Sequence, residues 1–155
     1  MAASAQKTSQ IQSLRNQSDM FSRTYNQQMA LYDTTLKQYN RKVEQLNKAK
    51  HVCEDCRAVV STNTSFVNNL RDYARHLDNC LEANGDIMCA IERLCSGNET
   101  NANSALDAAK KLRESLQAEV NALYVLYTQY YNAAQTALRQ KNAAYSQIQS
   151  LLKTR

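Results

Sequence analysis

The chain has 155 residues, of which 21% are charged, and a formal net charge of +5. It contains no proline and only two glycines, Gly85 and Gly97. Because tight turns depend on glycine and proline, this composition argues against β and mixed folds. It permits very long helices, since a proline costs about 3 kcal/mol in a helix interior and a glycine about 1 kcal/mol.

Uncharged polar residues are unusually abundant. Asn, Gln, Ser and Thr total 51 residues, about a third of the chain. A free coiled coil normally carries more Glu, Lys and Arg, which form its i,i+4 pairs. Helices coated in Asn, Gln and Ser are therefore expected to lie against other subunits, as in filaments, appendages and capsids; the alternative is a simple bias in codon usage.

The first predicted element is a helix over about residues 5–83. Residues 61–65 are rich in Ser, Thr and Asn, which compete with helical hydrogen bonds, so a kink or break there is the alternative. The apolar pattern passes through this segment in phase, which favours continuity. The apolar positions recur every seven residues, at Tyr25, Tyr32, Tyr39, Leu46, Cys53, Val60, Val67, Ala74 and Leu81.

A turn is predicted at residues 84–86, with Gly85 in the left-handed conformation that ends a helix and Asp86 as the next N-cap. A short helix is predicted over 87–95, followed by a polar loop over 96–103. Gly97 lies in the segment that ends this short helix.

The last predicted element is a long helix over 104–153, in which apolar spacings of three and four alternate. Its main stripe includes Leu116, Leu123 and Tyr130. A second, flanking stripe repeats every seven residues, at Tyr124, Tyr131, Leu138, Tyr145 and Leu152.

These elements predict an all-α fold: an elongated antiparallel helical hairpin with a short helical cap, forming a single domain over 1–155. Short connections make neighbouring helices antiparallel. If the chain folds back at Asn84/Gly85, facing residues have numbers that sum to about 169, which pairs Tyr32 with Ala137; a register shifted by seven fits equally well.

The apolar stripes are wider than one hairpin can bury, so further helical partners are expected. The predicted packing and interface residues are Tyr25, Tyr32, Tyr39, Leu46, Val60, Leu116, Leu123, Tyr130, Tyr131 and Tyr145.

Two of the five cysteines are candidates for a disulfide. Cys80 and Cys89 are nearly symmetric about the predicted turn, so they could reach the Cα separation that a bridge requires. Disulfides usually form in oxidising compartments, whereas the N-terminus lacks the apolar core of a signal peptide. Assembly in the cytosol, followed by oxidation in a particle, would reconcile the two observations.

Cys53 and Cys56 form a CxxC motif after His51. They are a possible second thiol pair and a weak zinc candidate, because zinc ligands normally come as two closely spaced pairs and the remaining cysteines lack that spacing. The alternative is that both are small apolar core residues.

Charge varies along the chain. Residues 1–50 carry a net charge of +5, residues 51–119 a net charge of −4 and residues 120–155 a net charge of +4. The basic residues are dispersed, so they do not predict nucleic acid or a membrane surface as the main partner. The sequence contains no run of 18 apolar residues, so we expect no membrane span.

No catalytic or cofactor-binding motif is present. The two histidines have no evident nucleophile partner, and no phosphate-binding glycine loop or Glu-x-x-His pair occurs. We therefore expect no enzyme activity and no cofactor. The sequence favours a structural subunit that associates with itself or with other structural proteins in a virion shell or filament, made in the cytoplasm. The alternatives are a coiled-coil adaptor or chaperone that presents its hairpin to a partner helix and, third, a protein that binds nucleic acid through its basic end.

Overall fold

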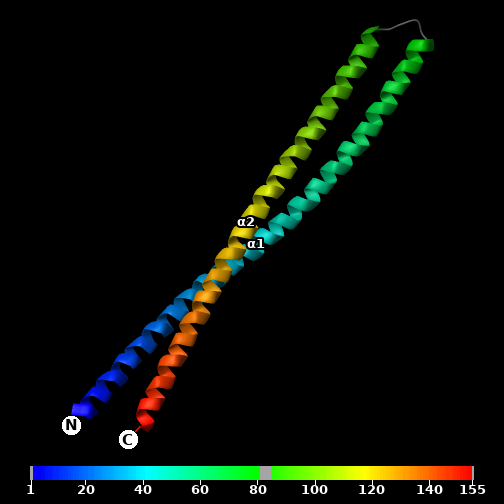
Figure 1. The fold of residues 1–155 in the computed structure, drawn as a ribbon. Helices are drawn as coiled ribbons and strands as arrows, with labels where there is room; N and C mark the ends of the chain where they lie inside the picture. Colours follow the sequence, from blue (N-terminus) through cyan, green and yellow to red (C-terminus); the bar gives the residue numbers. More distant parts are fainter. Residues whose placement is uncertain (1, 81–84, 155) are drawn as a thin grey trace. The chain divides into compact units, whose positions relative to one another are not determined.

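The computed structural model describes residues 2–80 and 85–154, with side chains described outside 73–80, 85–91 and 94. Two helices make up this part of the chain: α1, Ala2–Cys80, with 79 residues, and α2, Gly85–Lys153, with 69 residues (Figure 1). The described residues contain no strand. The chain is an all-α helical hairpin, which confirms the predicted fold class.

The helix α1 is continuous through residues 61–65. There, the Thr64 hydroxyl donates a hydrogen bond of 2.9 Å to the carbonyl of Val60, one turn earlier in the same helix. Thr8, Thr24 and Thr34 make the same bond to residues four positions back. The hydroxyl of Thr64 is thus satisfied within the helix that it could have opened.

The predicted cap helix over 87–95 and loop over 96–103 are wrong, because α2 runs without a break from Gly85. Ser, Asn and Thr each cost well under 1 kcal/mol in a helix, so a short polar run cannot by itself end one. Tertiary contacts also hold this segment: Cys95 is only 1% exposed, and Glu99 pairs with Arg71 of α1. The predicted turn at 84–86 is wrong for Gly85 and Asp86, which are helical, and Asn84 lies outside the described residues.

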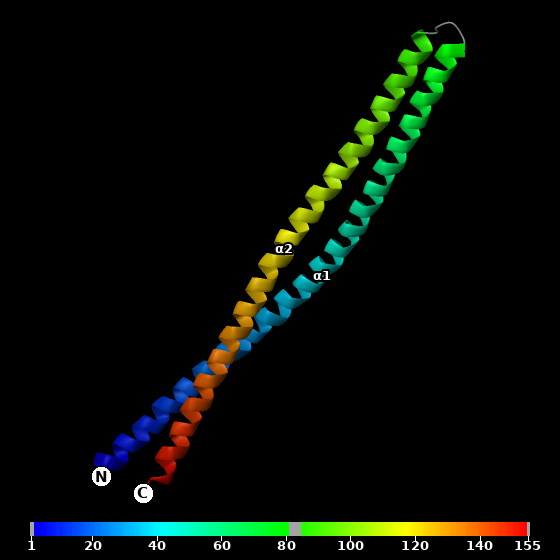
Figure 2. The same ribbon diagram turned by 45° about the vertical axis from the view of Figure 1, so that its right-hand side comes forward.

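The sequence predicts a single domain. In the structure, the contacts within the chain divide into two units, each built from both helices. Unit 1 comprises Met1–Arg41 and Val120–Arg155, and unit 2 comprises Lys42–Glu119. Within unit 1 the two ends of the chain lie side by side (Figures 1 and 2), and the Lys7 amine donates to the Thr154 carbonyl. Both units are antiparallel helix pairs.

The register differs from the one centred on Asn84/Gly85. In unit 1, Tyr39 contacts Tyr124 and Tyr32 contacts Tyr131, so facing residue numbers sum to 163 rather than 169. This is close to the alternative register shifted by seven. The reason is the position of the connection, since α1 ends at Cys80 and α2 begins at Gly85.

The core of each unit is thin. Unit 1 buries small side chains of α2, among them Ala134, Ala137 and Ala144, and the tyrosines of α1 in this unit are half-buried. Unit 2 mixes alanine and cysteine with a few branched side chains, and Val67 is fully buried. The buried apolar residues are Leu46, Ala49, Cys53, Val67, Cys95, Ala109, Leu116, Val120, Ala134, Ala137, Ala144 and Ile148.

The continuity of α2 predicts that Gly97→Ala stabilises the protein. No atom lies within 4 Å of the position that a Cβ would take at Gly97, and glycine inside a helix costs about 0.5–1 kcal/mol relative to alanine. We expect a gain of about that size in the free energy of unfolding, measured by urea denaturation at fixed protein concentration. Ala108→Gly, at an exposed position of the same helix, should lose a similar amount. A loss of stability in Gly97→Ala would contradict a helical segment here.

Candidate functional site

The CxxC motif lies at the helix interface of unit 2. Cys53 is 1% exposed, and Nη1 of Arg113 from α2 lies 3.8 Å from its sulfur. Cys56 is half-buried, whereas His51 is exposed and lies 3.7 Å from Glu54 of the same helix. No group of three metal-ligating side chains occurs among the described residues. The geometry fits Cys53 as a packing residue rather than a zinc ligand.

The other three cysteines differ in whether the structure describes their side chains. Cys95 is buried as a free thiol in unit 2. The side chains of Cys80 and Cys89 lie outside the described part of the chain, so their disulfide stays a prediction.

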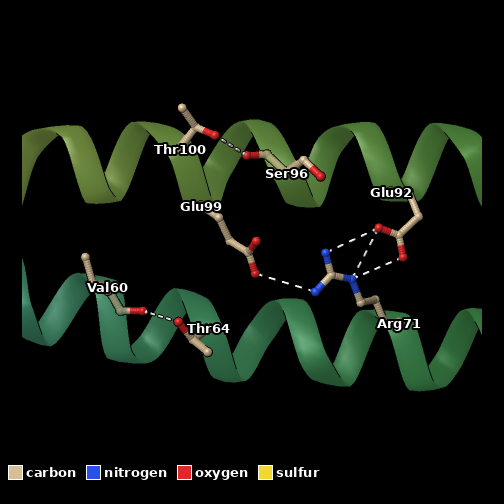
Figure 3. A network of polar contacts seen from close by, with 7 residues as sticks. All are labelled: Val60, Thr64, Arg71, Glu92, Ser96, Glu99 and Thr100. Carbon is tan, nitrogen blue, oxygen red and sulfur yellow. Dashed lines mark hydrogen bonds and ion pairs between the residues drawn. The ribbon is translucent and has the colours of Figure 1, made fainter.

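A polar cluster joins the two helices of unit 2 (Figure 3). Nε of Arg71 on α1 lies 3.1 Å from Oε1 of Glu92, and Nη1 lies 3.6 Å from Oε1 of Glu99, both on α2. The hydrogen bonds to Glu92, with the charges of Glu92 and Glu99, raise the pKa of Arg71 above its ordinary value. The sequence showed these charges, but their pairing depends on a register that it left open. The cluster fixes how α1 lies on α2 in this unit.

Unit 1 contains a tyrosine cluster, formed by Tyr32, Tyr39, Tyr124, Tyr127 and Tyr131. Tyr127 lies between the two α1 tyrosines, with ring centroids 5.9 Å from Tyr32 and 5.1 Å from Tyr39, both edge to face. Edge-to-face pairs at this separation are favourable beyond the area that they bury. The cluster therefore packs the helices together and leaves the outer tyrosines partly exposed.

The flanking stripe of α2 is the largest regular apolar feature on the surface of unit 1. We name it the α2 column: Tyr124, Tyr131, Leu138, Tyr145 and Leu152, one residue every seven. Tyr145 is 59% exposed and Leu152 54%, and Leu138 is half-buried. The column spans 28 residues, about 42 Å at 1.5 Å per residue.

A second exposed stripe lies on unit 2. We name it the α1 column: Val52, Val59 and Phe66, at the same spacing of seven and each at least 50% exposed. Val52 and Val59 line a groove of about 300 Å³ between the helices. The other lining residues are Asp55, Cys56, Ala102 and Ala105. The sequence reading missed this stripe, although its spacing was visible.

The predicted packing residues divide by position. Leu46 and Leu116 are buried, as a core requires, whereas Tyr131 and Tyr145 are exposed and belong to the α2 column. The half-buried members are Tyr25, Tyr32, Tyr39, Val60, Leu123 and Tyr130.

A larger groove, of about 490 Å³, lies in unit 1. Its volume is within the range of small-molecule sites. Its lining consists of amide, hydroxyl and leucine side chains, which supply no general acid, base or nucleophile with an activating partner. The lining residues are Gln10, Ser13, Leu14, Gln147, Ser150 and Leu151.

The chain matches no protein family, and comparisons with curated proteins and with solved structures gave no match. Within residues 2–80 and 85–154, neither helix contains a stretch apolar enough to cross a membrane. The proposed function therefore rests on the two columns and the grooves of this chain.

The Arg71 cluster predicts an electrostatic contribution to stability. Arg71→Gln should lower the melting temperature, because it removes the cation with which both Glu92 and Glu99 pair. The difference should shrink in 1 M NaCl, where the Debye length falls to about 3 Å. Arg93→Gln, at an exposed arginine directly after Glu92 on α2, is the charge-matched control and should change little. Equal melting temperatures for Arg71→Gln and wild type at low salt would contradict this.

The tyrosine cluster predicts a loss of stability at alkaline pH. Burial, with the nearby phenols of Tyr39, Tyr124 and Tyr32, raises the pKa of Tyr127 above its ordinary value of 10.0. Above pH 10 the unfolded chain therefore releases this proton before the folded chain does, and stability falls as pH rises through the folded pKa.

Thermal unfolding between pH 9 and pH 11.5 should show a steeper decline in wild type than in Tyr127→Phe. The exposed phenol of Tyr145 provides the comparison, and Tyr145→Phe should keep the wild-type slope. Parallel curves for wild type and Tyr127→Phe would refute the assignment.

Proposed function

We propose that this protein is a non-enzymatic structural subunit, which packs laterally with copies of itself or with other structural proteins in a larger assembly such as a virion shell or filament. The α2 column is the observation that supports this proposal most directly. Its three tyrosines and two leucines repeat every seven residues along one helix, which is the repeat by which helices pack side by side.

The free energy gained by burying the α2 column is comparable to the free-energy cost of association. A tyrosine about half exposed leaves on the order of 100 Å² outside the fold, and burying apolar area gains about 25 cal/mol per Å². Four such side chains would gain roughly 8–10 kcal/mol, against an association cost of about 4–15 kcal/mol. The column alone lies near balance, so stable association needs neighbouring side chains as well. Val125 and Leu31 of unit 1 are also exposed and could add to it.

The surface beside the α2 column also suits a helical partner. A parallel stripe of amide and hydroxyl side chains repeats every seven residues, at Asn121, Thr128, Gln135, Asn142 and Gln149. Neutral polar groups are cheaper to remove from water than charges, and they can pair across an interface. A partner helix could therefore cover both stripes without stranding a buried charge.

The adaptor alternative uses the same column against a helix of a different protein, and it differs in one measurable respect. A structural subunit associates with itself, whereas an adaptor stays monomeric until its partner is added. Sedimentation velocity of the purified chain across a concentration series separates the two.

We expect concentration-dependent association of the wild type and a shift toward monomer in Tyr145→Glu, by at least tenfold in the dissociation constant. A carboxylate in the column would be buried without a partner in the assembled state. Ser146→Glu places the same charge on the adjacent exposed residue and should associate like wild type. A wild type that stays monomeric throughout would refute the proposal.

A further inference from the structure

We infer that assembly is head to tail: the α2 column of one copy packs onto the α1 column and its groove on the next copy. This inference rests on the proposed function and adds which surfaces meet. The two columns lie on different units of the chain, so each copy offers one of each kind.

The two columns are complementary in shape. The α2 column presents large side chains, and Tyr145 is its most exposed member. The groove beside the α1 column is lined by small ones, including Ala102 and Ala105. Large side chains opposite small ones interdigitate at high packing density, whereas two α2 columns would place large side chains opposite each other.

The columns also share a repeat. Both place one apolar side chain every seven residues, and Val52 to Phe66 covers 14 residues against 28 for the α2 column. Helices with a common seven-residue repeat keep their contacts in phase along the interface. Each pair of neighbouring knobs on α2 therefore matches the spacing of Val52 and Val59.

Charge favours the mixed pairing over a symmetric one. Unit 1 has nine Lys and Arg against two Asp and Glu, a net charge of +7, and unit 2 has ten against twelve, a net charge of −2. Pairing two α2 columns would bring two strongly basic surfaces together, which is unfavourable. Pairing an α2 column with an α1 column avoids this repulsion, because unit 2 carries little net charge.

Asp55 gives the groove a polar group suited to a tyrosine. It lines the groove together with Cys56. A tyrosine that enters an apolar site needs a partner for its hydroxyl, and a carboxylate is a strong acceptor for such a donor. A tyrosine of the α2 column would donate its O–H to Asp55 while its ring covers Cys56.

A contact between two different surfaces does not close on itself as a symmetric dimer does. It continues from copy to copy, as an open filament or, where the rotation closes, as a ring. The two columns thus determine the kind of assembly as well as the fact of association.

The test uses two variants, each with one column blocked. Tyr145→Glu blocks the α2 column and Val59→Glu blocks the α1 column, and both positions are 59% exposed. Each variant alone should be monomeric in sedimentation velocity. Mixed in equal amounts they should form a 1:1 dimer that does not grow, because only one pair of intact columns remains. Ser146→Glu and Ala58→Glu, at adjacent exposed residues, are the matched controls and should assemble like wild type.

Two further measurements sharpen the result. Adding Asp55→Asn to the Tyr145→Glu variant should weaken the mixed dimer roughly tenfold, as for loss of a hydrogen bond to a charged group. Alkylation of Cys56, followed by peptide mass mapping, should slow on mixing, since the groove becomes covered. Far-UV circular dichroism confirms that each variant is folded before mixing.

The outcomes separate this inference from the proposed function. Wild type that assembles, with a mixture that stays monomeric, would overturn head-to-tail pairing and leave self-assembly intact. Dimers of either blocked variant alone would indicate symmetric pairing through the remaining column and would also overturn it. Monomeric wild type would remove both proposals.

Discussion

Two paired helices share a single interface, and the rest of this molecule follows from that constraint. Each helix can turn only one narrow stripe toward its neighbour, and any apolar residue outside that stripe stays in contact with water. Both helices here carry wider stripes. The buried set of unit 1 consists largely of small residues such as Ala134 and Ala144, while larger side chains such as Tyr145 remain outside. A chain that forms a complete core by itself is expected to bury its large apolar side chains and to expose small ones, which is the reverse of what is seen here.

The two units meet this constraint with different chemistry. In unit 1, tyrosine rings of α1 and α2 pack against one another and small side chains are buried, so the helices are held together by weakly directional contacts. Unit 2 also buries apolar side chains, such as Leu46 and Val67, and it adds directional contacts, in which Arg71 bridges Glu92 and Glu99. Such a pair is modest in strength at the surface, but it penalises a shifted register, since a slip would separate the charges. Specificity of pairing thus comes from polar contacts in one unit and from shape in the other.

The sequence predicted the helices well because a seven-residue repeat is a direct record of what each helix buries. It predicted continuity through residues 61–65, since the repeat kept its phase there. It failed at 96–103, where Ser, Asn and Gly suggested a loop, because contacts of Cys95 and Glu99 outweigh weak local preferences. The register was also beyond reach, since a repeat of seven makes shifts of seven nearly equivalent. The α1 column was overlooked because Val52, Val59 and Phe66 lie beside a stronger stripe.

The abundance of uncharged polar residues has a physical explanation when the apolar columns and the surfaces beside them are considered separately. Asn, Gln, Ser and Thr beside an apolar column cost less to remove from water than charged side chains would. Charge is instead unevenly divided, with unit 1 strongly basic and unit 2 weakly acidic. In the proposed assembly, two copies of unit 1 would repel each other, which disfavours symmetric pairing through the α2 column. If copies add in one direction, as proposed, the large side chains that each thin core leaves exposed are the ones that a neighbouring copy would cover.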